Sequence, residues 1–474
     1  MLRTPHSCLA RRPTLALALA WGLGASFAAA AQTTAAVPSM TLDQAIEYAL
    51  LHNPSLAAAH AQVAQGQEAR GASTDRWLPK LGANAQLFAA TDNNTAAVVL
   101  ATSPSLAIPR LGGTSYSSGL TVDNGASWRP YASSFLGIGV SQQVFDFGLT
   151  AAQIASADAT LLAERHELTQ SLLDTKLVVT VSFLAVQVAH QVVTAATAAV
   201  QRAAAQRDQA AALVNGQLRS RIFLDRAQAE LSRLRVAGMR ADEGLVVAQS
   251  NLAAALGFDQ PRLDALGALT TVAAIPGLDS ALGDALANDP SLKSLAAQIE
   301  AQRQTANAIS ALTHPAIFLT GTVSLRSGGA PSGGETPELA GYLPETPNWD
   351  IGLVANWSFF DPVVLAQSRA AHAQETVLRS NLQAAKQKLI SLVQNVWEGC
   401  VEAQKALPEL ETAFDAARQN YDQANVRFGQ GLGTSVEIAD AETLLTDAQV
   451  QLAEGQFGLA RARAQLERVM AGGL

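Results

Sequence analysis

The chain has 474 residues, of which 49% are hydrophobic and 15% charged, so it can bury a large apolar core. Its formal net charge is −8, and a chain this acidic is a poor nucleic-acid binder because nucleic-acid affinity rests on basic surfaces. The composition therefore excludes a disordered tail and argues against nucleic acid as a partner.

The first 31 residues have the three parts of a secretory signal peptide. Arg3, Arg11 and Arg12 form a basic start, LALALAWGLGASF is the apolar core, and the three alanines at 29–31 supply a small-residue cleavage site. We therefore predict that residues 1–31 are a signal peptide and that the chain is exported.

The two cysteines are not placed to form a bond in the exported chain. Cys8 lies before the apolar core and not at the cleavage site, so the usual lipoprotein attachment point is missing. Its removal with the signal peptide leaves Cys400 alone, and a single thiol forms no intrachain disulfide. Stability must then come from packing, and the role of Cys400 stays open.

One apolar run, at 177–200, is long enough to span a bilayer and carries no fixed charge. Polar residues recur through it, and amphipathic sequence continues on both sides without a break. We favour a helix packed against other helices over a transmembrane helix.

The chain contains an internal duplication. TLDQAIEYALLHNPSL at 41–56 aligns without a gap with GLDSALGDALANDPSL at 277–292, and the match continues to Pro79 and Pro315. We predict a first repeat over 32–257 with a helix, two strands, a long helix and a short helix. A linker at 258–276 and a second repeat over 277–474 follow.

Beyond the two prolines the hydrophobic period changes from helical to two, which indicates strands with one apolar face. A second strand pair follows from the alignment of GIGVSQQVFDFG at 137–148 with GLVANWSFFDPV at 352–363. The apolar positions of the four strands are Leu81, Ala83, Ala85 and Leu87; Leu136, Ile138, Val140 and Val144; Ile317, Leu319, Gly321 and Val323; and Ile351, Leu353, Ala355 and Phe359.

Between the strands of each repeat lie Gly/Ser/Thr/Pro-rich segments, at 91–128 and 327–348, that predict long loops. After each strand pair comes a long amphipathic run, at 149–213 and 363–428, which as a helix would extend roughly 95 Å. Short breaks at 214–221 and 428–435 precede the shorter helices.

Four strands with one apolar face cannot close a barrel, and open sheet edges are not tolerated in lipid. Other copies must complete the sheet. Two copies would give eight strands and a filled interior, whereas three would give twelve and a water-filled lumen. The opposite face suits such a lumen, because it carries Asn84, Gln86, Thr320, Thr322, Asn356 and Ser358.

Aromatic residues gather at or near the predicted strand ends, where an interfacial girdle would lie in a membrane barrel. The alternative is that they are ordinary core aromatics. The predicted girdle residues are Trp77, Trp128, Tyr131, Trp349 and Trp357.

These motifs together resemble the TolC-like outer membrane factors of Gram-negative bacteria. The resemblance rests on the duplicated L-x-x-A-x-x-x-A-L-x-x-x-P-x-L start, the W-x-P-K-L strand entry, the V-F-D-F-G and F-F-D-P exits, and F-x-x-G-x-G-T-S-x-E-x-x-D-A-E at the second break. It covers residues 40 to 470, nearly all of the exported chain.

The resemblance implies an α+β membrane protein without enzymatic activity. A homotrimer would form a 12-stranded outer-membrane β-barrel, with four strands per protomer, continued by a long α-helical periplasmic barrel. Outer-membrane lipid, a periplasmic adaptor protein and an inner-membrane transporter would be its partners.

The cargo is open at this point. Many efflux members carry an acylated N-terminal cysteine, and its absence favours type I secretion of a protein toxin through an ABC transporter. The alternative is the outer-membrane channel of a multidrug efflux pump. A helical structural scaffold, the third possibility, would not explain four strands.

Catalytic and metal signals are weak. The histidines are scattered without metal-ligand spacing, and GIGVSQ at 137–142 lies inside a strand rather than before a helix. We predict no catalytic residues, no metal and no cofactor.

The resemblance places the breaks between long and short helices at a periplasmic aperture. Glu437 and Asp440 match acidic residues that ring the constriction, and Phe428 matches an aromatic there. We hypothesise that Arg219, Arg221 and Arg226 bond these carboxylates across neighbouring turns and hold the aperture closed. The alternatives are a solvated charge cluster or helix capping by Thr434 and Ser435.

The same breaks are where the resemblance places adaptor docking. The predicted docking residues are Gly216, Leu218, Ser220, Gly431, Leu432, Gly433 and Thr434.

Overall fold

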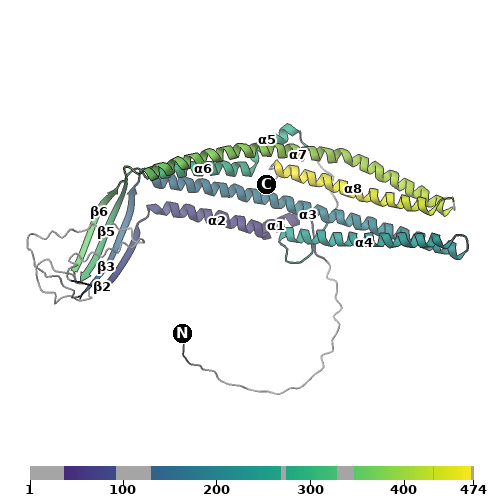
Figure 1. Cartoon of the computed structure of the whole chain (residues 1–474), viewed down its shortest axis with the longest axis horizontal. Helices are drawn as coiled ribbons and strands as arrows, with labels where there is room; N and C mark the ends of the chain where they lie inside the picture. Colours follow the sequence, from purple (N-terminus) through teal and green to yellow (C-terminus); the bar gives the residue numbers. More distant parts are fainter. Residues whose placement is uncertain (1–36, 92–129, 268–273, 328–345, 431, 471–474) are drawn as a thin grey trace, which may run out of the picture. The chain divides into compact units, whose positions relative to one another are not determined.

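The computed structural model describes residues 37–91, 130–267, 274–327, 346–430 and 432–470 (Figure 1). The predicted signal peptide and almost all of the two predicted long loops lie outside the described residues.

One succession of helices and strands occurs twice. The first consists of α1 (Leu42–His52), α2 (Pro54–Thr74), the short η1 (Asp75–Trp77), β2 (Lys80–Thr91), β3 (Pro130–Phe145), α3 (Leu149–Asn215) and α4 (Arg221–Leu256). The second consists of α5 (Leu278–Asn288), α6 (Pro290–Ala311), β5 (Ala316–Ser327), β6 (Thr346–Asn356), α7 (Pro362–Gly429) and α8 (Ser435–Val469).

The opening helix of each half, expected to be single, is two helices. Asn53 and Asp289 have non-helical backbones with ψ of 124° and 120°. Each precedes a proline, whose ring disfavours helical geometry in the residue before it. The Asn53 and Asp289 side chains then accept hydrogen bonds from Ser55 N and Leu292 N and cap the next helix.

The four predicted strands form one antiparallel sheet in the order β2-β3-β5-β6. Leu81 pairs with Val140, Val140 with Gly321, and Gly321 with Ile351, so the predicted apolar positions share one face. That face is open, with Leu81 79% exposed, whereas Ser141 and Thr320 on the opposite face are buried. An exposed apolar face is what contact with lipid requires.

The sheet differs from the prediction at two apolar positions. The β3–β5 register shifts between Gln143 and Phe145, so Val144 lies at an irregularity rather than in the regular alternation. Phe359 lies beyond β6, because that strand ends at Asn356 and the chain then turns toward Pro362 at the start of α7. Strand β6 begins at Thr346, so residues 346–348 belong to the strand and not to the loop predicted at 327–348.

The helices next to the sheet follow the order of its strands. Helix α2 leads into β2, β3 leads into α3, α6 leads into β5, and β6 leads into α7. Helix α3 contacts both α2 and α6, and α6 also contacts α7, which gives the order α2-α3-α6-α7 (Figure 1). Among the described strands, β2 and β6 each have one unpaired edge.

A buried aspartate fixes the turn from β3 into α3. The Asp146 carboxylate accepts hydrogen bonds from Thr150 N at 2.6 Å and from Gly148 N at 3.2 Å. Phe147 and Gly148 have positive φ angles of 51° and 98°, which a turn this tight requires. In the second half Asp361 caps α7, because its carboxylate accepts from Val363 N at 2.8 Å.

The long helices α3 and α7 have 67 and 68 residues and so extend about 100 Å each. Among the described helices, only α3 is long enough and apolar enough to cross a membrane. Within its apolar run, however, Val179, Phe183 and Val186 are buried in a cluster with Leu252 and Leu256 of α4. These contacts support the expected packing against other helices.

The linker at 258–276 contains a strand that sequence patterns did not indicate. Strand β4 (Asp264–Ala265) pairs in parallel with β1 (Ser39–Met40), through hydrogen bonds from Asp264 N to Pro38 O and from Leu266 N to Met40 O. His190 of α3 also lies 2.6 Å from the Asp264 carboxylate. The linker is thus joined to the start of the first half.

Cys400 is fully buried in a cluster with Leu389, Val393 and Leu466. Burial raises the pKa of its thiol. A buried thiol with a raised pKa is a packing residue rather than a reactive one.

Candidate functional site at the helical hairpin tips

Two helical hairpins end in short turns, one between α3 and α4 and one between α7 and α8. In the first turn, Gly216 N donates to Ala212 O and Leu218 N donates to Leu213 O, both at 2.9 Å. Gln217 has a φ of 59°. A left-handed residue after a helix, with N–H groups bonded back to the last carbonyls, is a common helix ending.

The second turn is closed by a capping box. Thr434 Oγ1 accepts from Glu437 N, and Glu437 Oε2 accepts from Thr434 N, both at 3.2 Å. Gly433 is buried, and a Cβ added there would lie 3.0 Å from Phe428 N. Close backbone approach therefore favours glycine at this position.

The capping box confirms that Thr434 caps the start of α8, which was one of the alternatives to ion pairs holding the aperture closed. It also gives Glu437 a hydrogen-bond partner, Thr434, at the start of the same helix. Ser435 is the first residue of α8 and takes no part in the box. Among the described residues, no ion pair joins the predicted arginines to the predicted carboxylates within one chain. The residues concerned, all exposed, are Arg219, Arg221, Arg226, Glu437 and Asp440. Such pairs between copies stay a prediction.

Phe428, which we predicted to be an aromatic of the aperture, is buried against the other hairpin, and its place at the aperture stays a prediction. Its ring stacks on Phe223 of α4 with centroids 5.7 Å apart and an interplanar angle of 11°. Phe428 belongs to a cluster with Tyr421 and Ile438, and Phe223 packs against that cluster. Aromatic packing therefore joins the two hairpins next to their turns.

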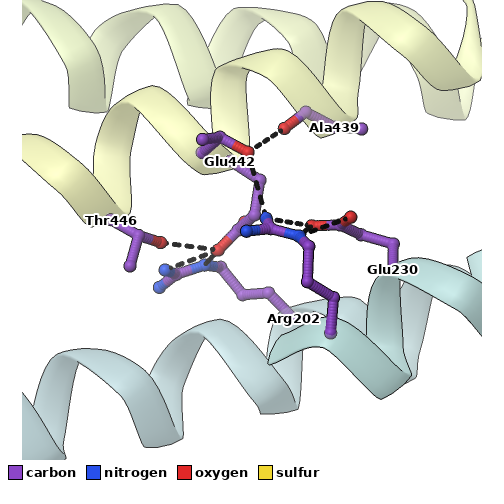
Figure 2. Close-up of polar contacts among 7 residues, drawn as sticks. Arg202, Glu230, Ala439, Glu442 and Thr446 are labelled. Atoms are coloured by element: carbon purple, nitrogen blue, oxygen red, sulfur yellow. Dashed lines mark hydrogen bonds and ion pairs between the residues drawn. The ribbon is translucent and has the colours of Figure 1, made fainter. Parts of the chain in front are cut away.

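A buried ion pair joins the same two hairpins (Figure 2). Arg202 Nε of α3 lies 2.9 Å from both carboxylate oxygens of Glu442 on α8, and Arg202 Nη2 lies 2.8 Å from Oε1. The side chain of Glu442 is 1% exposed and that of Arg202 is 24% exposed. A carboxylate this buried requires a cation partner.

Further groups on α7 and α8 complete the surroundings of this pair. The Arg202 guanidinium lies 5.4 Å from the ring centroid of Tyr421, within cation–π range. Thr446 Oγ1 donates to Glu442 Oε1 at 3.4 Å. Burial, and next the charge of Glu442, raises the pKa of Tyr421, so its hydroxyl stays neutral beside the pair.

A second contact runs from α4 to α8. Arg233 of α4 pairs with Glu230 of the same helix and donates from Nη2 to Thr443 Oγ1 at 3.3 Å. The hydrogen bond that Arg233 donates to the Glu230 carboxylate raises the pKa of Arg233, which remains charged. Thr443 Oγ1 in turn donates to Ala439 O at 3.0 Å.

The predicted docking residues are mostly exposed. Leu218 and Leu432 are 72% and 71% exposed, and Gly216, Ser220 and Thr434 are also exposed. Gly433 is the exception because it is buried, and Gly431 lies outside the described residues.

The predicted girdle residues are spread along the strands. Trp77 lies before β2 and Trp357 after β6, where its Nε1 donates to Thr313 O at 3.0 Å. Trp349 lies on the apolar face of β6 and is 77% exposed. Tyr131 lies in β3 opposite Ala90. Trp128 lies outside the described residues, and the girdle itself stays a prediction.

Among the residues that the structure describes, no group of three or more His, Cys, Asp or Glu side chains could hold a metal ion.

Comparison with known proteins defines the class: an outer-membrane channel protein. The model of the family described as "Outer membrane efflux protein" matches residues 45–258 and 281–472. The chain belongs to this family, which confirms the resemblance to TolC-like factors. Its location is the outer membrane of a Gram-negative bacterium, with an extension into the periplasm. A search of curated protein sequences found no match.

Solved outer-membrane channels share the fold. The chain is 18% identical to OprN, with a TM-score of 0.71 and coverage of 91% of this chain and 90% of that one. It is 14% identical to CmeC of Campylobacter jejuni, with a TM-score of 0.73 and coverage of 91% of this chain and 86% of that one. It is 19% identical to the open state of MtrE of Neisseria gonorrhoeae, with a TM-score of 0.70 and coverage of 91% of this chain and 89% of that one.

Proposed function

We propose that three copies of this chain form the outer-membrane exit duct of a tripartite efflux system. The observation that carries the proposal is an open four-stranded sheet whose exposed face is apolar and whose edges, β2 and β6, are unpaired among the described strands. Edges in lipid must be paired, and twelve strands leave a lumen that eight do not. The helices α2, α3, α6 and α7 lie in the same order as the strands β2, β3, β5 and β6 to which they connect, so a helical wall extends from the sheet.

A duct of this kind needs a periplasmic adaptor and an inner-membrane transporter, which supplies the energy. The exposed leucines at both turns, Leu218 and Leu432, support docking there, because apolar side chains at a polar tip favour association with a partner protein. Site-specific crosslinking from position 218 or 432 in cells would identify that partner.

Membership of the outer membrane efflux protein family favours small-molecule efflux. The missing lipoprotein cysteine favours the other alternative, type I secretion of a protein toxin. A deletion strain separates the two. Loss of the gene should sensitise cells to toxic small molecules while secreted polypeptides stay unchanged. Loss of one secreted polypeptide with unchanged drug sensitivity would support type I secretion instead.

The Arg202–Glu442 pair, we propose, holds the duct closed at its periplasmic end. Glu442 lies two residues, or about half a turn, beyond Asp440 on α8, and the pair joins a helix of the first half to a helix of the second. Separation of the two hairpins would leave the buried Glu442 carboxylate without its cation. Separation would also break the Phe223–Phe428 stack, so the ion pair and the aromatic contact favour the closed state together.

The exposed acids Glu437 and Asp440 have a different role in this proposal. Exposed pairs contribute only about 0–1 kcal/mol each, so they hold a closed state weakly. Carboxylates at a trimeric aperture would instead attract cations, and divalent cations bound there would block current. Opening and cation block are then governed by different residues.

Single-channel conductance in planar bilayers tests the duct and its closure. The wild-type chain should conduct weakly, and Arg202→Met should raise the conductance or the open probability several-fold. Arg235→Ala, which removes an exposed arginine of α4 outside the predicted aperture, is the matched control and should change neither. Conductance of Arg202→Met equal to wild type would refute closure by this pair, whereas absence of conductance in all variants would refute the duct.

A further inference from the structure

A cavity of about 400 Å³ lies between α2, α3 and α6, near the ends of these helices that join the sheet. Small residues leave it open, among them Gly66 and Ala69 of α2, Ala157 of α3 and Ala308 of α6. Its volume is within the range of small-molecule sites, roughly 300–1,000 Å³. The hairpin tips described above lie elsewhere on the helices.

Two oxygen acceptors on α3 in this cavity lack partners. Glu164 Oε2 and Gln153 Oε1 are buried and accept no hydrogen bond from the described part of the chain. The nearby hydroxyls donate elsewhere, Ser156 and Thr305 to Ala301 O and Thr160 to Ser156 O. Buried acceptors require a donor, so the cavity calls for a ligand that donates hydrogen bonds.

The Glu164 carboxylate lies directly against the backbone of α2. A Cβ added at Gly66 would come within 1.7 Å of Glu164 Oε2, so the Glu164 carboxylate would have to move away from its present position. Burial, and next the charge of Glu167, raises the pKa of Glu164. A cation bound in the cavity would stabilise the charged form of Glu164 against both its burial and the repulsion from Glu167.

The two ends of the cavity differ in charge. Glu164 and Gln153 are eleven residues apart on α3, which is three turns and roughly 16 Å. Arg76 and Leu149 line the cavity at the end nearer the sheet, and Ile309 and Leu312 of α6 add apolar surface. A cation is therefore favoured at Glu164, with an apolar group extending toward the leucines.

We propose that this cavity binds an amphiphilic primary amine, with the ammonium on Glu164 and the apolar body between α3 and α6. An ammonium offers three donors to the unpartnered carboxylate oxygen, which an anion cannot. Alanines and leucines would contact the hydrocarbon part. The proposal concerns a site in the helical wall and does not depend on how the tips open.

Calorimetric titration of the purified full-length protein with phenylbutylamine tests the site. Phenylbutanol is the matched ligand, because it keeps the apolar body and removes the charge, and it also measures partition into detergent. The amine should bind at least about tenfold more tightly than the alcohol. Equal heats for the two ligands would overturn the proposal.

Glu164→Gln keeps the shape of the side chain and removes its charge, so amine affinity should fall about tenfold or more. Asp158→Asn removes an exposed acid of the same helix, which pairs with Arg70 and lies outside the cavity, and should leave affinity unchanged. Gly66→Ala should also weaken binding, because the added methyl group displaces the carboxylate. Wild-type affinity in Glu164→Gln would overturn the assignment even if the other variants behave as expected.

Discussion

The two hairpin tips have the same helix–turn–helix form but use the third residue of the returning helix differently. In the second tip that residue is Glu437, which completes a capping box with Thr434. In the first tip it is Phe223, and the preceding Ser220 makes no side-chain capping bond. Phe223 instead stacks on Phe428 of the other hairpin. At this helix position the second tip is therefore stabilised by a capping box within its own turn, and the first by aromatic packing against the second.

The charges follow the same division. The first half supplies arginines, with Arg202 and Arg233 reaching toward α8, and the second half supplies the carboxylate of Glu442. At this contact the two halves supply opposite charges, so an ion pair joins them.

The largest expected effect comes from removing one member of the buried pair. Arg202→Met leaves the Glu442 carboxylate buried and unpaired, which should lower the free energy of local opening of α8 by about 3–5 kcal/mol. Amide hydrogen exchange in α8 measures that opening. The control variant Arg235→Ala, at an exposed arginine of α4, should change exchange by less than about 0.5 kcal/mol. Equal protection in both variants would show that the pair contributes nothing to tip stability.

A smaller effect is expected at the aromatic stack. Phe428→Ala removes a buried ring and should destabilise the tip by roughly 3 kcal/mol, whereas the partly exposed Phe223 should contribute less. The double variant should show a coupling of about 0.5–1.5 kcal/mol between the rings, as stacked aromatics do. Strictly additive exchange data would mean that the rings do not interact.

The smallest effect distinguishes the two turns directly. Thr434→Ala breaks the capping box and should lower the protection of the first turn of α8 by about 1 kcal/mol. Ser220→Ala removes a side chain that makes no capping bond and should change α4 by a few tenths of a kcal/mol at most. A similar loss in both helices would contradict the difference between the tips.

Most of the fold could be predicted from the sequence, because it depends on local period and on the duplication. Alternation around Leu81 and Ile351 located the strands, and long helical periodicity located α3 and α7. The break at Asn53 and Asp289 was missed, although an Asx-Pro pair at aligned positions is a direct signal for it. Strands β1 and β4, of two residues each, are too short for any period to show.

The contacts between the two hairpins could not be predicted from the sequence. The sequence indicated Glu437 and Asp440, the charged residues beside the turn, and their role at the aperture stays a prediction. It did not indicate that Glu442 is a buried acid. Its partner Arg202 lies 240 residues away, and no pattern along a helix reveals which arginine meets which carboxylate across two hairpins. Helical period alone could have indicated that Glu442 lies on the same face as the buried Ile438 and Leu445.

The most direct test of closure by the Arg202–Glu442 pair is a double-mutant cycle measured as single-channel conductance. Arg202→Met, Glu442→Gln and the double variant should all raise the open probability, and the second change should add little once the first has removed the interaction. That non-additive result is the one we predict. Independent, additive increases, or wild-type conductance in both single variants, would contradict the role of this pair in closing the duct.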